Sequence, residues 1–208
     1  MAMTERKATP RKRLTRADWA VAALAAIAEG GLSAVAIEPL AVRLGTTKGS
    51  FYWHFANRDA LLEAALDLWE ERTTTAVLAQ VDVSPMDPLE QLRLLIRLVV
   101  DIAEQDRVGL AVLADASHPI VRTALDRVTR ARINGIVSLF TKLGFPPAQA
   151  RQRGLLAYSA YLGHAQLAHS SPAVLPKGAH SRHAYLDHVV DTLASPNMQI
   201  RASRAQES

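Results

Sequence analysis

Residues 37–55 constrain the fold of this chain more than any other stretch of its sequence. The first part of the stretch repeats apolar residues at the spacing of one helical face. Gly45 follows the last of them and can take the left-handed backbone conformation that ends a helix. Thr46 or Thr47 can then cap a second helix through the side-chain hydroxyl. The stretch therefore predicts two short helices joined by a tight turn.

The second of these helices is short and has two different faces. Phe51 and Phe55 lie about one turn apart, so both point into a core. The other face carries a cation, hydroxyl groups, an imidazole and an indole, and no acid. A helix-turn-helix protein places such a helix in the major groove of DNA. A small helical core with a wet outer face is the alternative interpretation of the same residues.

Each polar residue of that face has a plausible partner on DNA. Lys48, at the start of the helix, can donate to guanine or to a phosphate. Tyr52 and His54 can donate to phosphate oxygens, and Trp53 can contact a thymine methyl group. Arg58 lies just after a helix cap, where the positive end of the helix favours a phosphate.

The same residues resemble those of the tetracycline-repressor (TetR) family of bacterial transcription regulators. The points of resemblance are Leu40-Ala41, Leu44-Gly45, Lys48-Gly49, Phe51-Tyr52-Trp53-His54-Phe55 and Asn57-Arg58-Asp59-Ala60-Leu61-Leu62, with Gly30-Gly31-Leu32 upstream. The match covers roughly residues 14–66. The aromatic run at this spacing, followed by a capped helix, is much more specific than a bare helix-turn-helix pattern.

The resemblance implies an all-α fold of about nine helices, with an N-terminal three-helix helix-turn-helix head and a C-terminal helical ligand-binding and dimerisation domain. It implies a homodimer that binds a palindromic operator in double-stranded DNA, most often as a repressor released by a small hydrophobic effector. No enzymatic activity, metal or cofactor is expected. The residues expected to bind DNA are Thr47, Lys48, Gly49, Ser50, Tyr52, Trp53, His54 and Arg58.

Two residues depart from the family pattern at the start of the first helix of residues 37–55. Ala36 stands where the family commonly has a threonine, and alanine can neither cap the helix nor contact a phosphate. Glu38 stands where some members have an arginine that reaches bases. An acid there repels phosphate but can accept from a cytosine amino group. Its alternative role is that of a first-turn acid favoured by the helix dipole.

The positive charge of the chain is concentrated at its N-terminal end. Residues 1–58 hold nine Lys and Arg against four Asp and Glu, a net charge of +5. The remaining 150 residues hold fifteen against sixteen, a net charge of −1. This asymmetry suggests a polyanionic partner for one domain. A basic disordered tail is the alternative explanation.

Composition excludes several other classes of protein. The chain has no cysteine, so disulfides, thiol catalysis and thiolate metal sites are excluded. Its longest apolar run, residues 19–28, is far shorter than the ~20 residues that span a bilayer. The basic N-terminus is followed by no apolar segment of a signal peptide. A cytoplasmic protein without a membrane partner is expected.

The rest of the chain reads as helices separated by loops. We expect a flexible basic arm over 1–13, the helix-turn-helix domain over 14–60, the ligand-binding and dimerisation domain over 61–195 and a disordered tail over 196–208. Caps and breakers predict one helix from near Arg16 to Gly30, and a fourth helix from Asn57 to about residue 79. Further helices are expected at 89–104, 107–116, 119–143, 147–169 and 181–194.

By resemblance, the last two helices pair with those of a second subunit as a four-helix bundle. Gly154, Ser159, Ala160 and Gly163 are small enough for close helix approach, and the apolar stripe of residues 181–194 supplies the rest of the interface. The candidates for an effector pocket are Trp69, Tyr158, Tyr161, His164 and Gln166. Ordinary core or interface packing is the alternative for each. No cluster of acidic or basic residues in the apolar region indicates a class of ligand, so a neutral, hydrophobic molecule is expected.

Two other functions stay open. His183, Asp187 and Asp191 are spaced to share one helix face, with His180 nearby, so a helical metal-dependent enzyme is conceivable. The same residues also fit the solvated face of that helix. The other alternative is a DNA-binding regulator that responds to no small molecule.

Overall fold

The computed structural model describes residues 14–195 and confirms the expected all-α fold, since no strand occurs within that range. The predicted arm (1–13) and tail (196–208) lie outside the described residues. The helices are α1 (Arg16–Gly30), α2 (Ile37–Arg43), α3 (Lys48–Phe51), α4 (Arg58–Glu70), α5 (Ala76–Asp82), α6 (Pro88–Ala103), α7 (Arg107–Ala114), α8 (Pro119–Lys142), α9 (Pro147–Ser170) and α10 (Ala179–Ala194). Because α4 and α5 are continuous through the π-helical turn η2 (Glu71–Thr75), the described range forms nine helices.

Helix α1 begins near the residue that the sequence predicted, at a capping box formed by Thr15 and Asp18. The backbone N–H of Asp18 donates to the hydroxyl of Thr15 at 3.2 Å, and the Asp18 carboxylate accepts from the backbone N–H of Thr15 at 2.7 Å. This exchange satisfies two backbone donors that the first turn leaves free. The helix ends before Gly31, whose φ of 70° favours glycine.

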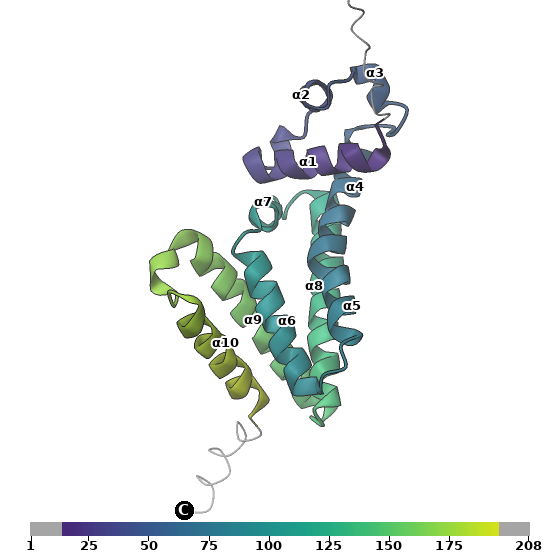
Figure 1. The fold of residues 1–208 in the computed structure, drawn as a ribbon. Helices are drawn as coiled ribbons and strands as arrows, with labels where there is room; N and C mark the ends of the chain where they lie inside the picture. The colour runs from purple at the N-terminus through teal and green to yellow at the C-terminus, as the bar shows by residue number, and fades with distance from the viewer. Residues whose placement is uncertain (1–13, 196–208) are drawn as a thin grey trace, which may run out of the picture.

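The helix-turn-helix head and the domain below it share one hydrophobic core. In the head, the ring of Trp19 in α1 meets that of Phe51 in α3 edge-on, with centroids 5.3 Å apart. The same cluster continues through α4 to Val112 in α7 and Val121 in α8, both fully buried. Figure 1 shows α7 and the upper end of α8 directly below α1.

The fourth helix differs from its prediction at the π-helical turn η2. It was expected to run unbroken to about residue 79, but the regular pattern changes after Glu70 and resumes at Ala76. In the turn, the hydroxyl of Thr73 donates to the carbonyl of Trp69 at 2.8 Å. Threonine hydroxyls bond backbone carbonyls in this way and compete with regular helix geometry. The side chain of Thr74 is buried.

Helices α5, α6, α8, α9 and α10 enclose a second core at the other end of the molecule (Figure 1). Leu186, Val190 and Leu193 of α10 are buried in this core. The expectation that this stripe forms the interface between subunits is therefore wrong, because it covers α6 of its own chain. None of the helices in the described range is both long and apolar enough to cross a membrane.

Candidate nucleic-acid interface and effector cavity

The turn between α2 and α3 has the geometry that its residues predicted. Gly45 takes a φ of 64°, which ends α2, and nothing lies within 4 Å of a Cβ added there. Thr47 caps α3, with its hydroxyl 3.4 Å from the backbone nitrogen of Ser50. Helix α3 itself has only four residues, and residues 52–54 form a turn that leads to Phe55. The buried ring of Phe51 stacks on that of Phe55 with centroids 5.6 Å apart.

The side chains opposite this aromatic pair face solvent. Trp53 is 88% exposed and Tyr52 is 54% exposed, whereas aromatic side chains in folded proteins usually bury most of their surface. Lys48 and Gly49 are exposed beside them, and Ser50 and His54 lie at the partly buried margin. These side chains form one continuous outward surface, which we call the α3 face.

One acid approaches the α3 face. The ammonium group of Lys48 lies 2.8 Å from a carboxylate oxygen of Glu38, and both side chains are mostly exposed. The hydrogen bond and the charge of Lys48 lower the pKa of Glu38, and Glu38 correspondingly raises the pKa of Lys48. Glu38 is thus the ion-pair partner of Lys48, which neither of its two expected roles, a base contact or a first-turn acid, includes.

Arg58 occupies a different position from the one expected. Its guanidinium donates from Nε to the carbonyl of Val35 at 2.7 Å and from Nη2 to the carbonyl of Leu32 at 2.5 Å. These bonds tie the first turn of α4 to the segment before α2. The guanidinium is thus directed at the backbone of the head. The sequence had instead predicted that it would be available to a DNA phosphate.

Arg16 is a residue of the head that the sequence analysis missed. Its guanidinium donates to the carbonyl of His54 at 2.9 Å and lies 4.2 Å from the centre of the Phe55 ring. It therefore fastens the end of the α3 face to α1. The sequence shows only that Arg16 stands in the first turn of α1. That position does not reveal a contact with His54, which lies 38 residues further along the chain.

Three of the five expected pocket residues gather around two small cavities in the C-terminal domain. The first, of about 30 Å³, lies between η2, α5, α6, α8 and α9. The second, of about 40 Å³, is lined by Trp69 and by residues of α7, α8 and α9. Tyr158 and Tyr161 line both, as does Arg132, which the sequence analysis did not consider.

The other two expected pocket residues do not line these cavities. His164 is buried among α6 and α10: its Nε2 lies 3.2 Å from a carboxylate oxygen of Glu104, and its ring stacks on Tyr185. Gln166 is exposed on the outer side of α9. Residues 164 and 166 lie only two positions apart, so a helix cannot direct both side chains into the cavity that Tyr161 lines.

Helix α9 exposes an apolar surface, which we call the α9 face. It contains Leu155, Leu156, Leu162 and Leu167, with the exposed small residues Ser159, Ala160 and Gly163 among them. Gly154 does not belong to this face: it is buried, and a Cβ added to it would meet Val137 of α8 at 2.6 Å. It therefore allows close packing inside the chain, whereas the sequence analysis assigned it to the subunit interface.

The acids of α10 are engaged in ion pairs with α6. Asp187 lies 2.8 Å from Arg97, and Asp191 lies 2.5 Å from Arg93. Arg97 lowers the pKa of Asp187 through its hydrogen bond and its charge. Within residues 14–195, no cluster of three or more His, Asp or Glu side chains is placed to hold a metal ion.

Comparison with known proteins gives a sequence match over the head and a fold match over most of the chain. Residues 21–65 match the model of the tetR family of bacterial regulatory proteins. The probable HTH-type transcriptional regulator ArpR of Pseudomonas putida is 33% identical over 82 residues, which are 39% of this chain and 39% of ArpR. The sequence similarity therefore spans about two fifths of that relative.

Solved structures share the fold at lower sequence identity. A transcriptional regulator from Rhodococcus sp. Rha1 matches with a TM-score of 0.68 and 23% identity, covering 87% of this chain and 94% of that one. The regulator FadR of Bacillus subtilis, in complex with stearoyl-CoA, matches with a TM-score of 0.64 and 16% identity, covering 86% of this chain and 97% of that one. The head thus matches the tetR family of bacterial regulatory proteins in sequence, and most of the chain shares its fold with solved transcriptional regulators.

Proposed function

We propose that this protein is a cytoplasmic DNA-binding transcriptional regulator that represses from a palindromic operator. The observation that carries the proposal is the α3 face. Lys48 and Gly49 of α3 face solvent there, as do Tyr52 and Trp53 of the turn that follows, while Phe51 anchors the helix in the core. An exposed cation on this helix and two exposed aromatic rings directly after it suit the major groove, where a helix reads base edges and phosphates.

A homodimer is part of this proposal, with the α9 face as its main interface. Its four exposed leucines and intervening small residues would be covered by the same surface of a second copy. Two heads held about 34–36 Å apart would then read half-sites one helical turn apart. The apolar stripe of α10 contributes little to this interface, because it is already buried.

A small hydrophobic effector is the second part of the proposal. Its site is the region around Trp69, Tyr158 and Tyr161, where two cavities meet. Cavities of about 30 and 40 Å³ hold little more than a water molecule each, so effector binding requires the side chains between them to move. The stearoyl-CoA bound to FadR supports the proposal, since a protein of this fold there accommodates a small molecule. Release from the operator follows if the effector favours a form with misplaced heads.

The test of DNA binding is fluorescence anisotropy with DNA that flanks the protein's own gene, compared with scrambled DNA of equal length. We expect tighter binding to the flanking DNA, lost in Lys48→Ala and in Tyr52→Ala. Lys48→Ala should reduce the slope of log affinity against log salt by about one per protomer. Arg130→Ala is the matched control, because Arg130 is an exposed cation of α8 that pairs with Asp126 in its own helix.

If the folded protein bound the flanking and the scrambled DNA equally well, this result would contradict the proposal of a sequence-specific regulator. A regulator without an effector is the second candidate, and the small size of the cavities favours it. It predicts operator binding that no small apolar molecule alters.

A further inference from the structure

Arg132 of α8 places a positive charge where most of the lining is apolar. It is partly buried and lines both cavities. Its Nε donates to the hydroxyl of Thr74 at 2.8 Å, and Nη2 donates to the hydroxyl of Thr73 at 3.0 Å. Its Nη1 donates to the hydroxyl of Tyr161 at 3.3 Å. The guanidinium also lies 5.4 Å from the centre of the Trp69 ring.

All of these partners are neutral. Within residues 14–195, every other arginine near the core of the helical domain has a carboxylate or a backbone carbonyl as a close partner, whereas Arg132 has only a carbonyl at 3.5 Å and no carboxylate within ion-pair distance. Hydroxyls and aromatic faces offset only part of the cost of removing a cation from water. Arg132 therefore remains able to bind an anion.

The geometry favours an anion on the side of the first cavity. In the second cavity, the carboxylate of Asp106 accepts from the indole of Trp69 at 2.9 Å and would repel a second negative charge. The lining of the first cavity contains no acid. Burial raises the pKa of Tyr161, so its hydroxyl keeps its proton and can donate to an anion beside the guanidinium.

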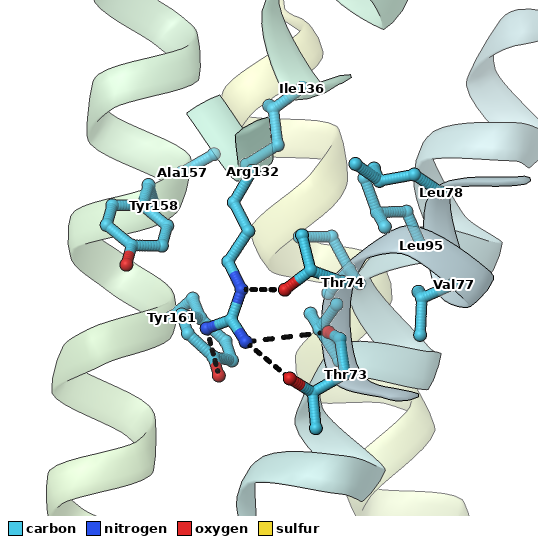
Figure 2. Close-up of a pocket in the computed structure, with 12 residues that line it drawn as sticks. Thr73, Thr74, Val77, Leu78, Leu95, Arg132, Ile136, Ala157, Tyr158 and Tyr161 are labelled. Atoms are coloured by element: carbon cyan, nitrogen blue, oxygen red, sulfur yellow. Dashed lines mark hydrogen bonds between the residues drawn. The ribbon is translucent and has the colours of Figure 1, made fainter. Parts of the chain in front are cut away.

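The remaining lining of the first cavity is apolar. Figure 2 shows the hydroxyls of Thr73, Thr74 and Tyr161 around the guanidinium, with Ile136 at the opposite end of the Arg132 side chain and with Leu95 next to Leu78. A molecule that filled this space would need one charged end and an apolar body.

We infer that the effector is an organic carboxylate with an apolar body, and that Arg132 binds the carboxylate while the body displaces side chains between the two cavities. The inference deepens the proposed function, on which its regulatory meaning rests, and revises the expectation of a neutral ligand. It also gives the ligand a route to the head. A carboxylate on Arg132 competes with Thr73 and Thr74 of η2, and η2 continues directly from α4, which begins in the head at Arg58.

The test compares probes of one chain length that differ in charge. Octanoate, octan-1-ol and octylamine are titrated by calorimetry into the full chain, with acetate as an anion that lacks an apolar body. We expect octanoate to bind about tenfold tighter than octan-1-ol, because a hydrogen-bonded ion pair contributes more than a neutral hydrogen bond. Octylamine and acetate should bind more weakly than octanoate.

Variants assign the preference to one residue. Arg132→Gln should bind octanoate and octan-1-ol equally, and Arg132→Lys should keep part of the preference because it keeps the charge. Arg130→Gln, two residues away on the same helix but exposed, should retain the full preference. Failure of Arg132→Gln to fold would leave the comparison of probes on the unaltered protein and on Arg132→Lys.

Several results would overturn the inference. They are no measurable octanoate binding, equal binding of octanoate and octan-1-ol to the unaltered chain, acetate binding as tightly as octanoate, or an unchanged preference in a folded Arg132→Gln. Operator binding is measured separately by anisotropy. Operator binding without a carboxylate preference would refute this inference alone, and a carboxylate preference without operator binding would refute the regulator.

Discussion

Replacing Arg58 by glutamine should destabilise the head. The two hydrogen bonds from its guanidinium reach the carbonyls of Val35 and Leu32, residues whose side chains are buried in the first core. Glutamine is shorter and uncharged, so it cannot span both carbonyls. Each hydrogen bond from a charged donor contributes ~1.5–3 kcal/mol, and the lower end applies because Arg58 is only partly buried. The expected loss is thus about 3 kcal/mol in the free energy of unfolding.

A loss of that size should be visible in thermal unfolding. For a chain of this length, 1 kcal/mol corresponds to about 2–4 °C in Tm, so Arg58→Gln should unfold about 6–12 °C below the unaltered protein. Circular dichroism at a fixed protein concentration measures this shift, since the stability of a dimer depends on concentration. Lys48→Gln is the matched control, because Lys48 is an exposed cation of the same head; its Tm should change little.

A contrasting result would identify Arg58 as a DNA contact without a structural role. In that case the Tm of Arg58→Gln would stay within about 1 °C of the unaltered protein, while the salt dependence of DNA binding would fall by about one counterion per protomer. Our structural assignment of the guanidinium would then be incorrect.

Three further predictions concern the helical domain. Gly154→Ala should lower stability by about 1–3 kcal/mol in a thermal melt, because the added methyl group meets Val137 at 2.6 Å, close to the α8 backbone. Leu155→Glu should leave the fold intact but shift sedimentation from dimer to monomer, since Leu155 is 55% exposed in one chain; an unchanged dimer would exclude the α9 face. Asp187→Asn should reduce stability at neutral pH, and the difference should vanish in melts at acid pH. Because Arg97 lowers the pKa of Asp187 below 3.8, the carboxylate stabilises the fold above that value and loses its contribution as the pH falls through the lowered pKa.

The helices could be predicted from local sequence because local contacts determine where they begin. Thr15 caps α1, and the side chain of Asn57 accepts from the backbone nitrogen of Ala60 at the start of α4, as expected. The π-helical turn could not be predicted, since helical periodicity does not distinguish Thr73 and Thr74 from ordinary helix residues, and their partner Arg132 lies about 60 residues away along the chain. Helical periodicity also could not assign the α10 stripe, because a pattern of apolar residues does not reveal whether its own chain or a second one covers it.

For the candidate DNA-binding site, too, some features could be predicted from the sequence and others could not. The exposure of Tyr52 and Trp53 could be predicted, because they lie between Phe51 and Phe55, whose rings both point into the core. The partners of Arg58 and Glu38 could not, because each lies on another element and charge alone does not select among many partners.

The hydrophobic core shared by the head and the domain below it limits how regulators of this kind can be recombined. Grafting residues 14–60 onto another helical domain would remove the head from Val112 and Val121, which are fully buried against it here. The acceptor would have to supply side chains of matching volume from its own α7 and α8, because cores of native density tolerate neither voids nor excess atoms. A chimaera that transplants residues 14–70 together with 107–128 keeps the buried members of that cluster together. The position of the cut, more than the identity of the head, should therefore decide whether such a hybrid folds.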